Sequence, residues 1–500
     1  MRSIVNLAAR LLLILATTVA VSSALGQTVT IAVKAEPNTL DPHKVVGRQS
    51  EAFLANIFDG LTARDAAGTL VPGLAESWEQ VGDTTWRFHL RHGVAFQNGE
   101  AFDSESVRFT LERAGDPDSP ATTWSQINTI TGVDVVDAYT VDIHTVSPDV
   151  LLPARLAELF GPMLPPVYTV EAGDDFGTHP VGTGPFVLKE WVKNERLVLA
   201  ANEDYWRGAP SVKEIVVRPI AEDATRVAAL IAGEVDLIEG LPHVMVDMID
   251  SRPELRVERV SASRVFYISI DASVKPLDDV RVRQALNYAI DRQAIIDRLF
   301  GGLGRPAATI ISAQAFGFDP SVEPYPYDPE KAKALLAEAG YPNGFSIEFD
   351  YFSGSVADHY ALSQAVAGYW TQIGIDVKEN AYELGVFQEK RGANKAAPLY
   401  VYSLGDVFLE PFWLVEWLAA GDMSRRYSNP EVNALIQEIR STFDASRRAE
   451  LYSEVQRLMK EDAQHAFLFQ VDTLWGASDR VNFTLRADEV PWFYPLSLAD

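Results

Sequence analysis

The sequence has no cysteine among its 500 residues, and this absence excludes several kinds of site. A chain without thiols forms no disulfide bond, no thiolate metal site and no cysteine nucleophile. It also offers no cysteine that a lipid could modify to hold the exported protein at a membrane.

The common catalytic signatures are absent as well. No Gly-x-Ser-x-Gly, P-loop or His-Glu-x-x-His pattern occurs, and no spacing of carboxylates marks a glycosidase pair. The glycines at 301, 302 and 304 follow a predicted helix and are interpreted as a helix end and loop. His89 and His92 lie on a strand and turn, where their side chains diverge. We therefore expect no cofactor and no metal site, and these patterns give no indication of an enzyme.

Positive charge is scarce. The 43 lysines and arginines are outnumbered by 69 aspartates and glutamates, which gives a formal charge of −26. An acidic surface of this size argues against nucleic acid or anionic lipid as a partner. We therefore expect neither nucleic acid nor a membrane surface as a partner. The net charge does not indicate which ligand the protein binds.

The N-terminus has the three parts of a secretory signal. Arg2 and Arg10 form a positive region, the segment 11–21 is apolar, and Ala24-Leu25-Gly26 is a small-residue cleavage site before Gln27. The apolar run is shorter than the ~20 residues that span a bilayer, and no later segment reaches that length. We expect residues 1–26 to be a cleaved signal peptide, and we expect no membrane anchor.

The length exceeds that of a usual single core, so two or three domains are expected. Strands and helices alternate along the chain without an internal repeat. Strands are predicted at 29–33, 86–90, 133–136, 140–144, 196–200, 215–219, 264–270, 347–352, 399–403 and 468–474, and helices at 225–232, 329–340, 358–373, from 429 and near 444.

The segment 276–302 predicts one amphipathic helix. Asp278 or Asp279 can accept hydrogen bonds from the first turn, and Gly301 can adopt the left-handed conformation that ends a helix. Apolar residues recur between them at helical spacing, whereas three arginines fall elsewhere on the helical wheel: Arg281, Arg283 and Arg292.

The amino-acid sequence of this segment also resembles a signature of the extracytoplasmic solute-binding proteins of family 5, the receptors of peptide- and nickel-type ABC importers. Eight further segments carry the same resemblance in the same order: LDPH at 40–43, IFDGL at 57–61, VPGLAESW at 71–78, FHLRHGVAF at 88–96, GTGPF at 182–186, NEDYW at 202–206, GEVD at 233–236 and YDPEKAKALL at 327–336.

The resemblance implies a fold and a cellular setting. The fold is an α/β two-lobed clamshell of the type II periplasmic binding proteins, in its larger form with an extra subdomain in lobe I. Mapped here, lobe I is about 27–265 plus 476–500, its extra subdomain about 60–180, and lobe II about 266–475. The expected protein is a periplasmic monomer that captures a small molecule or peptide and delivers it to an inner-membrane ABC permease.

The resemblance also implies which residues contact the ligand. The segment 400–411 is similar to the family's main recognition strand and loop, and Asp406 falls where dipeptide-type members have an aspartate that pairs with the α-ammonium group. The neighbouring candidate contacts, together with aromatic and strand-end residues expected near the cleft, are Tyr402, Leu404, Gly405, Phe408, Trp413, Ser353 and Trp124.

The segment departs from the family pattern at three points. Leu404 replaces a frequent tryptophan, and Glu410-Pro411 replaces an Asp-Pro. Residues 351–355 lack the arginine that holds the ligand carboxylate in dipeptide-type members. Arg48 or Arg264 could supply a positive group instead, and the alternative for each is a surface or interlobe charge.

The ligand itself stays open between several classes. The leading expectation is a peptide or a similar small amino-bearing solute. An opine, a glutathione-like molecule or an oligosaccharide fits the same fold, and a secreted hydrolase with an unmarked carboxylate pair is the alternative of a different class. Because none of the eight histidines lies in the recognition segment, metal transport is not favoured.

Overall fold

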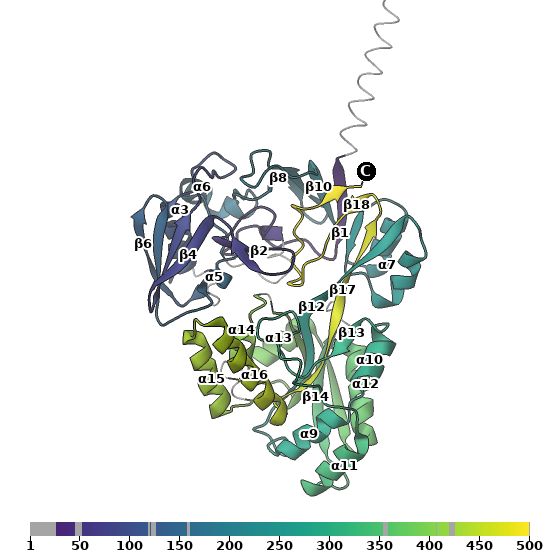
Figure 1. Ribbon diagram of the computed structural model, residues 1–500. Coiled ribbons are helices and arrows are strands. Elements are labelled where there is room, and N and C mark those ends of the chain that lie inside the picture. Colours follow the sequence, from purple (N-terminus) through teal and green to yellow (C-terminus); the bar gives the residue numbers. More distant parts are fainter. Residues whose placement is uncertain are drawn as a thin grey trace, which may run out of the picture.

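The computed structural model describes residues 27–45, 53–118, 121, 127–157, 161–353, 359–406, 408–419 and 426–499. These residues form two lobes, one above the other in Figure 1, joined by the long strands β12 (Leu255–Ile270) and β17 (Ala466–Ser478). Both strands belong to an 11-stranded sheet with the order β15-β14-β16-β12-β17-β11-β1-β10-β9-β8, in which β13 (Gly304–Pro306) pairs with β17. A single sheet therefore extends from one lobe into the other.

The upper lobe contains one end of this sheet and a separate antiparallel sheet. In the first, β1 pairs in parallel with β10 and β11. The second has the order β4-β5-β7-β6 and shares a core with α3. The elements of the upper lobe, besides the upper halves of β12 and β17, are β1 (Thr28–Val33), β2 (Thr62–Arg64), β3 (Leu70–Pro72), β4 (Ala75–Gly82), β5 (Thr85–Leu90), α3 (Ser104–Ala114), β6 (Ile130–Asp137), β7 (Thr140–Thr145), α5 (Leu152–Arg155), α6 (Pro166–Ala172), η1 (Gly173–Gly177), β8 (Phe186–Val192), β9 (Arg196–Ala201), β10 (Glu214–Pro219), α7 (Asp223–Ile231), β11 (Leu237–Glu239), η2 (His243–Met245), α8 (Val246–Asp250), β18 (Val481–Asn482) and β19 (Ser497–Leu498).

The lower lobe has helices on both faces of its part of the sheet. One face shares a core with α9 to α12, and the other with α14 to α16. The elements of this lobe, besides the lower halves of β12 and β17, are α9 (Val280–Tyr288), α10 (Arg292–Leu299), β13, α11 (Pro329–Glu338), β14 (Ser346–Ser353), α12 (His359–Gln372), β15 (Asp376–Glu383), α13 (Leu384–Gly392), β16 (Leu399–Leu404), α14 (Phe412–Ala419), α15 (Pro430–Ser441) and α16 (Ala445–Glu461).

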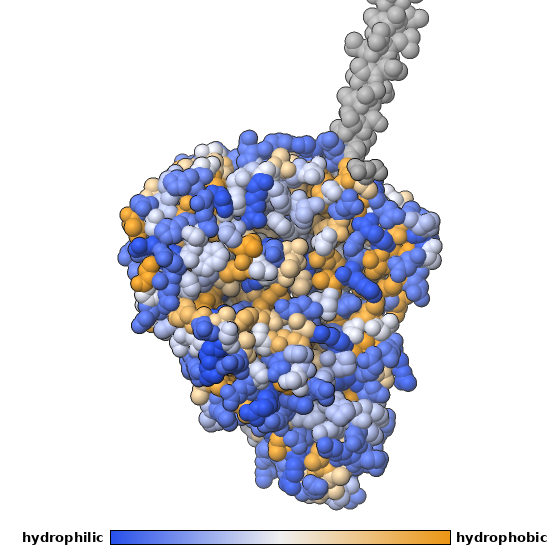
Figure 2. All heavy atoms as spheres, in the orientation of Figure 1, coloured by the Kyte–Doolittle hydropathy of each residue, from blue (hydrophilic) through white to orange (hydrophobic). Residues whose placement is uncertain are grey.

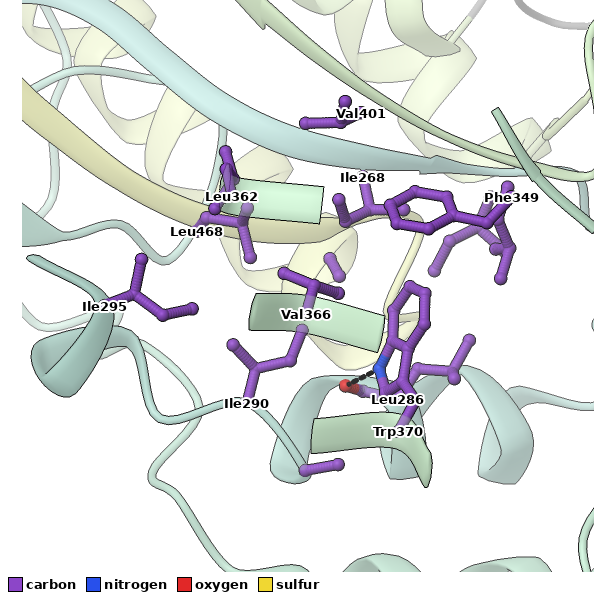
Figure 3. Close-up of a cluster of buried hydrophobic side chains, with 14 of the residues drawn as sticks. Ile268, Leu286, Ile290, Ile295, Phe349, Leu362, Val366, Trp370, Val401 and Leu468 are labelled. Atoms are coloured by element: carbon purple, nitrogen blue, oxygen red, sulfur yellow. Dashed lines mark hydrogen bonds between the residues drawn. The ribbon is translucent and has the colours of Figure 1, made fainter. Parts of the chain in front are cut away.

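The first of these cores is centred on a buried tryptophan. Trp370 of α12 has no exposed surface, and its indole N–H donates to the Leu286 carbonyl oxygen of α9 at 3.0 Å, the dashed line in Figure 3. Ile268 of β12 and Leu468 of β17 belong to the same cluster. The crossing strands are therefore held by apolar packing within the lower lobe.

The same two strands are also held within the upper lobe. Leu474 and Trp475 of β17 lie in two upper cores, only a few residues beyond Leu468. Between the two sets of cores, the pairing of β12 with β17 is irregular between Ser261 and Val265. We call this junction between the lobes, at Ser261 to Val265 of β12 and the facing part of β17, the waist. A bulged strand bends most readily at such a point.

Two elements expected from the sequence are confirmed, one hairpin and one helix. The predicted hairpin at 133–144 is the antiparallel pair of β6 and β7. Helix α11 begins at Pro329 and is capped by Asp328, which accepts from the Lys331 N–H at 2.9 Å. Within the described ranges, no helix is long and apolar enough to span a membrane.

The prediction of one helix over 276–302 is wrong, because the segment forms two. The first, α9, begins after Asp279, whose carboxylate accepts from the Arg281 N–H at 2.8 Å, and Gly301 has the expected positive φ of +60°. The chain breaks after Tyr288 because Asp291 caps a second helix, accepting from the Ala294 N–H at 2.9 Å.

Two of the three arginines that were expected to lie away from the apolar face of this segment are also buried. Arg292 donates to the carbonyl oxygens of Phe467 (2.7 Å) and Asn287 (3.0 Å), and Arg283 donates to that of Asp462 (2.8 Å). Burial lowers the pKa of Arg292 to about 10. Because these guanidinium groups satisfy carbonyls of the helix ends and of β17, they serve as interior hydrogen-bond donors.

Candidate ligand-binding site

The recognition segment lies at the waist. Leu404, the last residue of β16, pairs with Val265, where the irregular stretch of β12 ends. The loop that follows touches the upper lobe: the Arg64 guanidinium of β2 donates to the carbonyl oxygens of Phe408 and of Gly68 (2.6 Å). Gly68 has φ +83°, and a Cβ there would lie 2.1 Å from Leu409 Cδ1. The β2–β3 turn therefore packs directly on the loop. Figure 1 shows β2 in the upper lobe, above α14 of the lower lobe.

Asp406, the predicted anchor, is fully buried in this loop. Its Oδ1 accepts from the Phe408 N–H at 3.1 Å, whereas Oδ2 has no hydrogen-bond partner among the described residues. Burial raises the pKa of Asp406 to about 7, an effect that Glu410 reinforces and Arg64 opposes. An unpartnered buried carboxyl oxygen is costly, so the site favours a ligand that brings a donor or a positive charge.

Glu410, the second acid of the loop, has partners within the protein. It accepts from the Tyr452 hydroxyl at 3.1 Å and lies 3.5 Å from Arg448. Burial raises the pKa of Glu410 as well, and the Arg448 charge lowers it. Glu410 Oε1 thus has partners within the protein, whereas the buried Oδ2 of Asp406 has none among the described residues.

Gly405 lies against an ion pair between crossing strand β12 and the segment that follows β18. A Cβ at Gly405 would lie 3.2 Å from Glu489 Oε2 and 3.5 Å from Arg264 Nη2, so only a residue without a side chain fits easily. Arg264 and Glu489 form an ion pair at 2.9 Å, and Thr473 donates to Glu489 at 3.0 Å. Arg264, considered above as a free positive group, is therefore already paired.

The described aromatic candidates lie in β16, in the loop that follows it and in α14. The Tyr402 ring lies 6.0 Å from Phe352 and 6.3 Å from Phe387, and its hydroxyl accepts from Gln388 Nε2 at 3.0 Å. Phe408 is buried, and Leu404 is half-buried against the core that includes Tyr267. The indole N–H of the half-buried Trp413 has no hydrogen-bond partner in the described part of the chain. Figure 2 shows apolar side chains gathered along this waist.

Two of the predicted contacts cannot be placed. Trp124 lies outside the described residues, as does Arg48. Ser353 is the last residue of β14 and pairs with Glu383, but its side chain is not among those described.

The structure adds residues that the sequence did not reveal. Arg64 reaches Phe408 across 344 residues of chain, a contact that no local spacing predicts. The part of the chain that the structure describes holds no group of three histidine, aspartate or glutamate side chains arranged to bind a metal.

Comparisons with known proteins agree on a family. Residues 69–424 match the model of the bacterial extracellular solute-binding proteins, family 5. The chain is 31% identical over 448 residues to the glutathione-binding protein GsiB of Salmonella paratyphi A, covering 87% of each.

Solved structures give the same result. The periplasmic binding protein DppA from Helicobacter pylori, in complex with the peptide STSA, is 25% identical with a TM-score of 0.82, covering 95% of this chain and 98% of that one. AgaA from A. tumefacien R10, in complex with agropinic acid, is 26% identical with a TM-score of 0.80, covering 95% and 99%. The chain therefore belongs to family 5 of the bacterial extracellular solute-binding proteins, a family of two-lobed α/β receptors rather than enzymes.

Proposed function

We propose that this protein captures a peptide or a similar small solute with a free amino group, and that Asp406 binds the ammonium group. The observation that carries the proposal is the buried Oδ2 of Asp406, which has no hydrogen-bond partner among the described residues. An ammonium group would supply both the missing donor and a compensating charge, and such a charge-assisted bond is strong where water is excluded.

The similar proteins support this class of ligand. One is named for binding glutathione and another was solved with a peptide, and both of those ligands carry an amino group. A third was solved with agropinic acid. An opine is therefore the second candidate ligand within the same fold.

Capture would occur by lobe closure. The lobes, about 27–265 plus 476–500 and about 266–475, would rotate about the irregular stretch of β12 and β17 at the waist. The Arg64 contact to Phe408 would form only when the lobes meet. Because ligand binds the closed form more tightly than the open form, it shifts the equilibrium toward closure.

The closed protein would then deliver its ligand to an ABC permease. We place it in the periplasm, cut before Gln27 and freely diffusing as a monomer, since the chain has an N-terminal secretory pattern and no cysteine. This setting agrees with the extracellular character of the family.

The test is a binding screen with protein that has been unfolded and refolded to remove carried-over ligand. The panel contains dipeptides, longer peptides, glutathione, opines and oligosaccharides, each alongside an N-acetylated form where an amine exists. A ligand at ~100-fold above its Kd should raise stability by about 2.7 kcal/mol, which is visible as a shift of the melting temperature.

Only ligands with a free amino group should raise the melting temperature, and the Asp406→Asn variant should lose this response. The matched control is Asp174→Asn, which alters an acid whose side chain is 99% exposed in the upper lobe. Binding that is confined to oligosaccharides, or that survives Asp406→Asn unchanged, would refute the assignment.

A further inference from the structure

Two consecutive leucines of the upper lobe pack in the cores of different lobes. Leu152, the first residue of α5, has no exposed surface and belongs to the core of the sheet β4-β5-β7-β6. Leu151 is also buried, with 6% of its surface exposed, but the cluster to which it belongs is that of α14, α15 and α16 in the lower lobe. Val150 packs against the same lower cluster. A short apolar segment of one lobe is therefore inserted into the other.

Two further contacts join the lobes at this place. The Val150 N–H donates to the Arg440 carbonyl oxygen of α15 at 3.4 Å. The ring of Trp86, in β5, lies 5.9 Å from that of Phe443, in the segment between α15 and α16. Figure 1 shows α5 of the upper lobe above α14 and α15 of the lower lobe. These contacts involve neither the crossing strands nor the recognition segment, so they form a separate connection between the lobes.

The upper side of this connection is held rigidly by one buried acid. Asp149 Oδ1 accepts from the Leu151 N–H at 3.1 Å, and Oδ2 accepts from the Thr129 hydroxyl at 2.7 Å and from Arg155 at 3.0 Å. The Asp149 carbonyl oxygen accepts from the Trp86 indole N–H at 2.8 Å. Because these bonds lie within the upper lobe, the segment keeps its shape when the lobes separate, and little conformational entropy is lost when they meet.

The lower side is tied to the helix that follows the recognition segment. The Arg440 guanidinium lies 5.2 Å from the Phe412 ring centre and donates to the Glu416 carboxylate. Both of these partners belong to α14, which begins where the recognition segment 400–411 ends. The surface that receives Leu151 is therefore part of the same packed unit as the candidate ligand-binding loop.

The connection should favour closure whatever the ligand. Separating the lobes would expose the Leu151 side chain to water, because the cluster that buries it belongs to the lower lobe. Burial of an aliphatic side chain of this size shifts such an equilibrium by about tenfold to hundredfold. A ligand that binds the closed form loses apparent affinity as the closed fraction falls.

We propose that Leu151, Val150 and Trp86 of the upper lobe, against Arg440 and Phe443 of the lower lobe, form a closure contact that sets the affinity for all ligands by a common factor. The inference rests on the proposed function, because lobe closure is the step by which the ligand would be captured. Choice among ligands stays with the recognition segment, whereas the closure contact determines how readily the lobes meet around any of them.

The first test needs no ligand. Small-angle scattering would compare ligand-free proteins at pH 5, where Asp406 keeps the proton of its buried state. Leu151→Ala and Phe443→Ala, which alter the contact from opposite lobes, should each increase the radius of gyration. The matched control is Val146→Ala, which changes a valine that is 70% exposed in the same part of the upper lobe and should keep the wild-type radius. Radii equal to that of wild-type protein in both contact variants would overturn the proposal.

The second test uses two ligands of different structure. Calorimetry at pH 8 would measure reduced glutathione and alanyl-leucine on refolded protein. Leu151→Ala should weaken both by the same factor, about tenfold to hundredfold, and Val146→Ala should weaken neither. A loss confined to one ligand would show that Leu151 acts through ligand contact, and unchanged affinities would show that the contact does not support closure; either result overturns the proposal.

Failure of the proposed function would look different. If wild-type protein binds neither of these amines, the Asp406 proposal fails, and the radii of the ligand-free proteins then decide on the closure contact alone. Larger radii in Leu151→Ala and Phe443→Ala, with an unchanged radius in Val146→Ala, would still support it.

Discussion

The buried acid at the waist predicts that lobe closure depends on pH even without ligand. Arg64 and the β2–β3 turn of the upper lobe cover the loop that holds Asp406, so separating the lobes would hydrate that carboxyl group. Its pKa would then fall from about 7 in the closed form toward the ordinary value of 3.8. The closed form therefore binds more protons than the open form between these two pH values.

The sign and size of the effect follow from this difference. A group that holds its proton more tightly in the closed form favours closure at low pH, and this advantage is lost as pH rises from about 4 to about 7. A difference of about 3 pKa units, at ~1.36 kcal/mol each, corresponds to about 4 kcal/mol, or roughly a thousandfold in the closure equilibrium. Above about pH 7 the equilibrium should not change further through this group.

Small-angle scattering of ligand-free protein gives the measurement. The radius of gyration should be larger at pH 8 than at pH 5, and an amine ligand should restore the compact value at pH 8. Asp406→Asn should reduce the pH response. Because burial also raises the pKa of Glu410, the double variant with Glu410→Gln should abolish the response. Equal radii at both pH values in wild-type protein, or an unaltered response in the double variant, would refute the reasoning.

Three further predictions concern contacts described above. Arg64→Ala should increase the radius of gyration at pH 5 and weaken ligand binding, because the lost bond to Phe408 joins the lobes; an unchanged radius would contradict this. Arg292→Lys should lower the unfolding free energy in urea by about 2 kcal/mol, since lysine cannot reproduce the forked bonds to several carbonyls, whereas the exposed Arg298→Lys should change it little. Trp370→Ala should cost about 3–5 kcal/mol in the same assay because it empties the centre of a core, and a loss below ~1 kcal/mol would show that the core is not packed as described.

Local patterns predicted some elements of this fold, such as α11 and the β6–β7 pair, whereas α3, β8 and α13 were not predicted. Caps such as Asp328 and Asp279, and the glycine with positive φ at 301, are set by residues only a few positions apart. The break between α9 and α10 was missed because the apolar spacing continues across it, although the Asp291 carboxylate caps a new helix there. The burial of Arg292 depends on carbonyls of β17 that lie 175 residues further along the chain.

The candidate site was proposed from the resemblance to the family and not from spacing alone. Tyr402, Gly405 and Asp406 lie close together in the structure because they belong to one strand and the loop that follows. Gln388 comes from a separate helix, and its relation to Tyr402 depends on how α13 packs beside β16. Spacing along the sequence contains no information about such packing, so this contact became visible only in the structure.

In the periplasmic setting proposed above, the continuous sheet also determines when the protein can become native during export. The core around Val29 and Ile31, near the beginning of the chain, includes Trp475, Phe483 and Phe493 near its end. The upper lobe therefore cannot complete its interior until almost the whole polypeptide has crossed the membrane, while the lower lobe is formed from a contiguous internal stretch apart from its share of the crossing strands. Contacts between such distant residues form slowly. The first part of the chain to emerge must remain incompletely folded while the lower lobe assembles, which makes the last residues to arrive the ones that close the fold.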